Sequence, residues 1–268
     1  MDFIEKDSYK DAIDLLSKAI DADPDYVDAY LERARTYEKL KDYNNAALDY
    51  DRATTFLTFN TEAFYDAGRI YYELGEYDKA IARLDRAIEI KGKNLAAIQH
   101  KTMALIKKND YYAALKQAEE AISIKENPLN LYLHGLVAEK LDNLTGAQRD
   151  FEKAISREKG FTDAYIALAR VKHSMNNHKE ALESIGKAIE NEPNNIEAFI
   201  VRSEIYRKQL DYPKAIDDLS KAILIKDNNT DLYIMRGTYY QEFTQHSNAI
   251  NDFNKALLID GKKRRCTF

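Results

Sequence analysis

Residues 61–92 read TEAFYDAGRIYYELGEYDKAIARLDRAIEIKG, and this stretch is the unit from which the chain is built. Its first half places Phe64, Ala67, Gly68 and Tyr71 at the i, i+3, i+4, i+7 spacing of a buried helix face. Its second half, after an interruption at residues 74–76, carries another apolar stripe at helical spacing. Neither helix can bury its stripe alone, so the stretch predicts two helices that pack against each other and against neighbouring pairs.

Alanine recurs at two positions of this unit along the whole chain. The two series advance in register, in steps of 34 residues with a single step of 33. A fixed period of roughly 20 to 50 residues indicates a solenoid of stacked repeats. Alanine suits these positions because helices that cross there would be held apart by a larger side chain. The first series is Ala12, Ala46, Ala80, Ala114, Ala147, Ala181, Ala215 and Ala249, and the second is Ala19, Ala53, Ala87, Ala121, Ala154, Ala188, Ala222 and Ala256.

The period and the order of small and large residues resemble the tetratricopeptide repeat family. The aromatic residue of that family's turn is present five times, whereas its terminal proline survives only as Pro24 and Pro193 and its tryptophan is replaced throughout. The resemblance implies an all-α fold, a right-handed α-solenoid superhelix of about seven and a half helical hairpins. The turn aromatics are Tyr9, Tyr43, Tyr77, Tyr111 and Tyr212.

The repeats divide the chain into three segments. Residues 1–26 are a partial first repeat, residues 27–261 hold seven repeats, and residues 262–268 are a basic tail. The fourth repeat is one residue short near Pro128, so its turn should differ from the others. The seven repeats start near Val27, Thr61, Leu95, Pro128, Thr162, Ile196 and Thr230.

Composition argues against several functional classes. The net charge of −5 argues against a non-specific nucleic-acid binder, which is usually basic. No apolar run approaches the roughly 20 residues that cross a bilayer, and Met1 is followed by charged residues rather than a signal peptide. The single cysteine, Cys266, cannot form an intramolecular disulfide. We therefore expect a cytoplasmic protein without nucleic-acid or membrane partners.

The chemistry-bearing residues do not form a recognisable catalytic or metal motif. None of the five histidines has a metal-ligand spacing, and no glycine-rich phosphate loop follows a strand. His173 and His178 are five residues apart, which would place them on different faces of one helix. The sequence therefore predicts a protein that is not an enzyme, with no cofactor and no metal.

The resemblance places the partner-binding groove on the first helix of each repeat, at its second, fifth, sixth and ninth positions. Repeats two and three present charges of both signs there, and repeats four to eight present a mainly apolar stripe. Exposed apolar stripes of this length mark contact surfaces, although the alternative is that some of these residues pack between repeats. The candidate groove residues are Arg35, Tyr65, Asp66, Arg69, Met103, Tyr132, Leu133, Leu136, Ile166, Arg170, Ile200, Val201, Glu204, Ile234 and Met235.

One partner class can be tested on the sequence itself. Co-chaperones of this family hold a chaperone's C-terminal carboxylate with a Lys/Asn, Asn, Lys/Arg constellation over successive repeats. The fifth groove positions here contain no lysine, and the sixth and ninth contain no asparagine. The sequence therefore argues against a chaperone tail held by such a carboxylate clamp.

The leading interpretation is a non-catalytic scaffold or adaptor that binds a segment of a partner protein in its concave groove, within a larger complex. Met1 falls inside the first helix of a repeat, so we expect the chain to be a piece of a longer protein. One alternative is therefore the repeat region of a longer enzyme or assembly factor whose other domains lie outside this chain. A second alternative is a self-assembling scaffold, because solenoid ends without capping elements can stack end to end.

Overall fold

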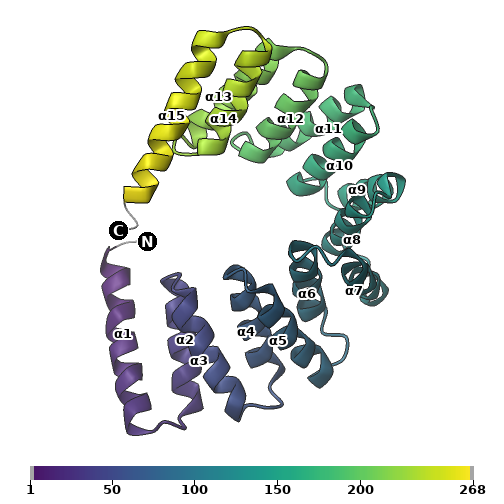
Figure 1. Cartoon of the computed structure of the whole chain (residues 1–268). Coiled ribbons are helices and arrows are strands. Elements are labelled where there is room, and N and C mark those ends of the chain that lie inside the picture. Colours follow the sequence, from purple (N-terminus) through teal and green to yellow (C-terminus); the bar gives the residue numbers. More distant parts are fainter. Residues whose placement is uncertain (1–2, 266–268) are drawn as a thin grey trace. The chain divides into compact units, whose positions relative to one another are not determined.

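The computed structural model describes the backbone of residues 3–265 and the side chains of residues 8–261, so Cys266 lies outside the described residues. Within this range the chain forms fifteen α-helices and no strand, which confirms the predicted all-α fold (Figure 1). The helices are α1 (Phe3–Ala22), α2 (Val27–Lys39), α3 (Tyr43–Phe56), α4 (Thr61–Glu73), α5 (Tyr77–Ile90), α6 (Leu95–Lys107), α7 (Tyr111–Ile124), α8 (Pro128–Lys140), α9 (Leu144–Arg157), α10 (Thr162–Ser174), α11 (His178–Asn191), α12 (Ile196–Lys208), α13 (Tyr212–Ile225), α14 (Thr230–Glu242) and α15 (His246–Arg265).

The chain divides into two compact units, residues 1–141 and residues 142–268. In the first unit α2 packs on α3, α4 on α5 and α6 on α7, and in the second α10 packs on α11, α12 on α13 and α14 on α15. The first helix of each repeat begins at the residue named from the sequence as the repeat start. The loop before α8 spans residues 125–127, whereas the other loops that precede a first helix span four residues, so the predicted short turn is confirmed.

Local sequence explains where the helices begin and end. Most begin behind an Asp or Asn whose side chain accepts a hydrogen bond from the first turn, as Asn60 does from the Ala63 amide at 3.0 Å. Every first helix from α2 to α14 ends two residues before a residue in the left-handed conformation. Only Gly75 adopts this conformation without steric cost, whereas Leu210 (φ 61°) and Thr244 (φ 62°) adopt it against their side-chain preference.

The alanines of the two series lie at the centre of the packing, as predicted. Fourteen of the sixteen are at most 4% exposed. Ala12 and Ala19 are only half-buried, and among the described residues no first helix before α1 covers them. Gly68 marks another close approach: a Cβ there would lie 2.6 Å from Cγ of Leu84, which is closer than carbon atoms tolerate. Small residues therefore set the helix spacing, and the hairpins stack because their backbones nearly touch.

Three hairpins also contain a bidentate arginine–aspartate pair that sequence reasoning did not predict. In each, an arginine on the first helix donates two hydrogen bonds to an aspartate sixteen residues later on the second helix, at 2.6–2.8 Å. The aspartates are buried, so each pair ties two helices together in a setting that excludes water. The pairs are Arg33–Asp49, Arg202–Asp218 and Arg236–Asp252.

Helix α15 differs from the second helices α3 to α13 in length and exposure. It runs for 20 residues, through Gly261 and on to Arg265, so part of the expected basic tail continues the helix. Ile250 and Leu257 are 57% and 70% exposed, whereas Ile216 and Ile223, which hold the same positions one repeat earlier, are buried. No first helix follows α15 among the described residues, and its apolar stripe is therefore uncovered.

Candidate functional site

The charged residues expected in the first unit form a network on α2 and α4. Arg69 donates a hydrogen bond to the Glu38 carboxylate at 2.6 Å, and the Arg69 guanidinium also lies 3.8 Å from the Asp66 carboxylate. Burial raises the pKa of Asp66, and the Arg69 cation opposes that rise. Arg35 is exposed and pairs with Glu32 at 2.6 Å on its own helix. Arg69 is therefore largely neutralised within the protein, and Arg35 is the more accessible cation.

An aromatic group follows this network on α4 and α6. The Tyr65 ring meets the His100 ring edge-on at 5.3 Å, and the Tyr65 hydroxyl lies 3.3 Å from Nδ1 of His100. Burial lowers the pKa of His100, which favours the neutral imidazole. Tyr65 is half-buried, and its contact with His100 orients the ring. The sequence did not reveal this contact.

The apolar stripe expected over repeats four to eight is interrupted by core residues. Leu133, Ile166 and Val201 are each 3% exposed, so they are not part of an accessible lining. Ile166 on α10 and Val201 on α12 belong to one core cluster, because neighbouring first helices pack together at these positions. For these three residues the packing alternative is the correct one. Half-buried members of the stripe remain at Met103, Tyr132, Leu136, Ile200 and Met235, and Ile234 is 45% exposed.

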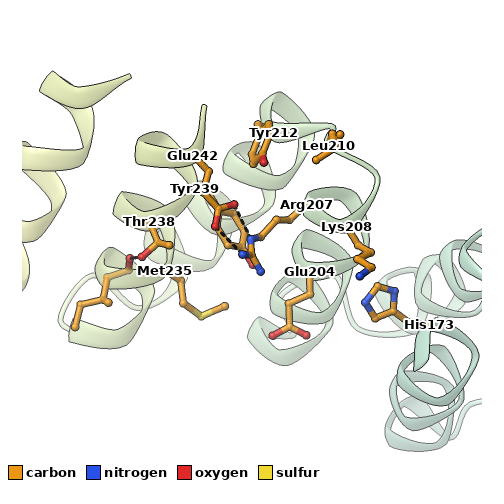
Figure 2. Close-up of a pocket in the computed structure, with 11 residues that line it drawn as sticks. His173, Glu204, Arg207, Lys208, Leu210, Tyr212, Met235, Thr238, Tyr239 and Glu242 are labelled. Atoms are coloured by element: carbon orange, nitrogen blue, oxygen red, sulfur yellow. Dashed lines mark hydrogen bonds and ion pairs between the residues drawn. The ribbon is translucent and has the colours of Figure 1, made fainter. Parts of the chain in front are cut away.

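Two members of this accessible remainder, Ile234 and Met235, line one cavity in the second unit. The cavity measures about 770 Å³ and opens between α10, α12 and α14, with the turn between α12 and α13 at its rim (Figure 2). Ligand-binding sites typically measure roughly 300–1,000 Å³. Of the fifteen candidate residues, three line this cavity: Glu204, Ile234 and Met235. The other lining residues are His173, Arg207, Lys208, Leu210, Tyr212, Thr238, Tyr239 and Glu242.

An ion pair forms the upper wall of the cavity. Arg207 on α12 donates two hydrogen bonds, at 2.8 and 2.6 Å, to the carboxylate of Glu242 on α14 (Figure 2). The Arg207 hydrogen bonds lower the pKa of Glu242. The Arg207 guanidinium also lies 5.4 Å from the centre of the Tyr239 ring. The two charges of this wall are therefore already matched.

Glu204 lies on the same helix, one turn before Lys208, but has no such match. Its carboxylate forms no hydrogen bond or ion pair with any residue that the structure describes. Loss of hydration raises its pKa and repulsion from Glu197 adds to this, while the cations of Arg170 and Arg207 oppose the rise. Arg170, the remaining candidate, lies 3.9 Å from Glu197.

His173, at the other end of the cavity, and its neighbour His178 correct a sequence-based expectation. His173 ends α10 and His178 begins α11, so the turn between the helices brings their Nδ1 atoms to 3.1 Å. Burial lowers the pKa of His173, and the nearby His178 and Lys208 lower it further. The expectation of two different faces assumed one continuous helix, and the helix break at residue 175 overturns it.

Residues 8–261 contain no group of three or more His, Cys, Asp or Glu side chains arranged to hold a metal ion. None of the helices in the described part of the chain is both long enough and apolar enough to cross a membrane.

All the protein-family models that match the chain describe the same repeat. Three models, each described as a tetratricopeptide repeat, match residues 3–48, residues 61–94, and residues 162–195 together with 230–263. No curated protein matches the sequence.

Comparison with solved structures gives several similar folds. A tetratricopeptide repeat protein from Parabacteroides merdae ATCC 43184 is 17% identical with a TM-score of 0.73, over 95% of this chain and 94% of that one. A chain of the APC/C hetero-tetramer Cut9–Hcn1 is 15% identical with a TM-score of 0.71, over 94% and 50%. YrrB, described as a TPR protein with an unusual peptide-binding site, is 22% identical with a TM-score of 0.50, over 66% and 92%. At these identities the likeness concerns the fold alone.

Proposed function

The chain belongs to the tetratricopeptide repeat family, and from that premise we propose that it is a non-catalytic scaffold that binds a segment of a partner protein. The binding surface is the face of the first helices in the second unit, centred on the cavity between α10, α12 and α14. Proteins of this fold act chiefly through interactions with other proteins. Fold alone does not determine function, so the proposal is argued from the cavity.

The observation that carries the proposal is the exposure of apolar side chains at a concave site. Ile234 is 45% exposed and Met235 is half-buried, and both line the same cavity. Leu210 is 72% exposed at the rim and is held in the left-handed conformation. Exposed apolar residues around a hollow indicate a contact site, and methionine adapts to varied partner surfaces.

The similar structures support the proposal by analogy of fold. YrrB is described as having a peptide-binding site, and the Cut9–Hcn1 chain is part of a hetero-tetramer. In the first unit, Arg35 and Tyr65 are the accessible candidates for additional polar contacts with a partner. Leu133, Ile166 and Val201 are buried, so the proposal gives them no contact with the partner.

A random library of displayed 12-residue peptides, selected on the intact chain, tests the proposal. Peptides enriched on the wild type should lose binding to Ile234→Asp, because a carboxylate replaces an apolar contact in the cavity. They should keep binding to Leu224→Asp, which alters a residue that is 85% exposed on the second helix α13, outside the cavity. Equal binding to the wild type and both variants would show that the cavity is not the binding site.

A second candidate function, self-association, is favoured by one observation. Ile250, Leu257 and Leu258 leave an apolar stripe on α15 that the equivalent residues of the preceding repeat only partly share. Light scattering over a concentration series should show a higher mass for the wild type than for Leu257→Glu if this stripe joins copies. A constant monomer mass for both proteins would exclude this candidate.

A further inference from the structure

The Glu204 carboxylate lines the cavity described above and forms no hydrogen bond or ion pair with a described residue, although the Arg170 and Arg207 cations act on it at longer range. Arg207 and Glu242 neutralise each other across the same space at 2.6 Å, and Tyr239 covers the guanidinium of that pair. Glu204 lies one turn before Arg207 on α12, yet no described side chain donates a hydrogen bond to it. Glu204 is exposed to solvent, so its carboxylate is accessible to a cation supplied from outside and can form a charge-assisted hydrogen bond with it.

The surroundings of Glu204 fit the stem of a long basic side chain. Met235 on α14 lies on the other side of the cavity from Glu204 (Figure 2), and Ile234 on the same helix adds further apolar lining. The Tyr239 ring is 4% exposed and lies behind this surface. Lysine and arginine place their methylene groups along such surfaces while their charged ends reach a polar partner. The pKa of Tyr239 is raised by burial, and the nearby Glu204 and Glu242 raise it further. The phenol therefore stays neutral and does not compete as an anion.

The other charges of the cavity leave the Glu204 side as the place for a cation. Lys208 is exposed and lies near His173, at the α10 end of the cavity. A second cation at that end would meet the Lys208 ammonium, whereas one at Glu204 meets an anion. Glu197, on the same helix, adds negative charge near Glu204, and the Arg170 and Arg207 cations oppose it. Both cations already have a carboxylate nearby, since Arg207 pairs with Glu242 and Arg170 lies 3.9 Å from Glu197. The cavity is therefore more positive at the Lys208 end and more negative at Glu204, although the charges of its lining residues nearly cancel in total.

We propose that the cavity between α10, α12 and α14 recognises a lysine or arginine of the partner segment, whose cation pairs with Glu204 and whose stem lies along Ile234 and Met235. This inference rests on the proposed function, because it names the chemistry of the segment that the same cavity binds. The partner is thus a basic peptide rather than an acidic chain end, which agrees with the absence of a carboxylate-clamp pattern in the sequence.

The experiment repeats the peptide selection on the intact wild type, Glu204→Gln and Glu183→Gln. Glu183 is a matched control because it is an exposed glutamate on the second helix α11, outside the cavity. Wild type and Glu183→Gln should enrich lysine or arginine at one peptide position, and Glu204→Gln should lose that preference. The best wild-type peptide is then resynthesised with norleucine in place of its basic residue. Removing either charge should weaken binding by about tenfold or more, and removing both should add little further loss.

Each outcome bears on one of the two proposals. Basic enrichment that survives Glu204→Gln, or peptides without a basic preference, overturns this inference. If those same peptides still lose binding to Ile234→Asp, the proposed function stands. If no peptide depends on either Glu204 or Ile234, both are overturned. Circular dichroism of each variant confirms that a lost interaction does not reflect a lost fold.

Discussion

The Arg202–Asp218 pair offers a direct test of how the hairpins are held together. Asp218 has a side chain that is 2% exposed, and both of its oxygens accept hydrogen bonds from Arg202, at 2.8 and 2.6 Å. Replacing Asp218 with Asn keeps the side-chain volume but leaves the guanidinium without a counter-charge. Breaking a buried ion pair in this way costs about 3–5 kcal/mol, and the 21% exposure of the Arg202 side chain places the expected loss near the lower end.

The chain contains its own control for this prediction. The sixth repeat holds Leu168 and Ser184 at the same two positions, and both are buried. The double variant Arg202→Leu with Asp218→Ser therefore copies an arrangement that this fold already tolerates. Because apolar replacement of a buried pair is often neutral, the double variant should recover most of the stability lost in Asp218→Asn.

Urea unfolding followed by circular dichroism measures these changes in the free energy of unfolding. The exposed pair Lys214–Asp211 is a second control, and Asp211→Asn should cost less than about 1 kcal/mol. A loss below about 1 kcal/mol for Asp218→Asn, or a double variant less stable than that single variant, would refute the reasoning. Because repeat proteins can unfold in parts, the whole curve is compared and not only its midpoint.

Three further predictions follow from single residues. The pKa of Glu204 is raised in the folded protein, so the protonated side chain favours folding at low pH, and this contribution is lost as pH rises from the ordinary carboxyl pKa through the raised one. Glu204→Gln should therefore have the wild-type melting temperature below about pH 4 and a higher one at pH 7. A lower melting temperature than the wild type at pH 7 would contradict this. Gly68→Ala should destabilise the first unit by about 1–3 kcal/mol in urea unfolding, because the added carbon would lie 2.6 Å from Leu84; an unchanged midpoint would show that the helices are not in close contact there. Leu210→Gly should raise stability by up to about 1 kcal/mol, since glycine adopts φ 61° without strain; a lower melting temperature would contradict this.

Most of the fold was predictable because it depends on a few residues whose role is steric. Alanine at Ala80 and Ala87 and glycine at Gly68 leave room for a neighbouring helix, and any chain that repeats them every 34 residues must stack. The shortened loop before Pro128 followed from counting residues. These features are local or periodic, and the sequence displays both.

The candidate site was less predictable because exposure depends on neighbours. Ile166 and Ile234 hold the same repeat position, yet one is buried between α10 and α12 whereas the other opens into a cavity on α14. The residue type is the same, so the packing of neighbouring helices decides how exposed the side chain is. Glu204 was among the candidates, but only the structure shows that no described residue forms a hydrogen bond or ion pair with it.

Sequence reasoning missed the arginine–aspartate pairs and the His173–His178 contact, and the two differ in whether the sequence contains a pattern that could have predicted them. The arginine–aspartate pairs recur at a spacing of sixteen residues at fixed repeat positions, so aligning the repeats for charge as well as for size would have revealed Arg202 and Asp218. The His173–His178 contact left no periodic signal, because it arises from one turn between α10 and α11.

Site-specific photo-crosslinking tests the central claim most directly. A photo-reactive amino acid is placed at position 234 in one protein and at position 224 in another, and each is irradiated with the best peptide from the wild-type selection. We expect crosslinked peptide from position 234, inside the cavity, and none from position 224 on α13. Crosslinks from position 224 alone, or equal yields from both positions, would contradict a binding surface on the first helices.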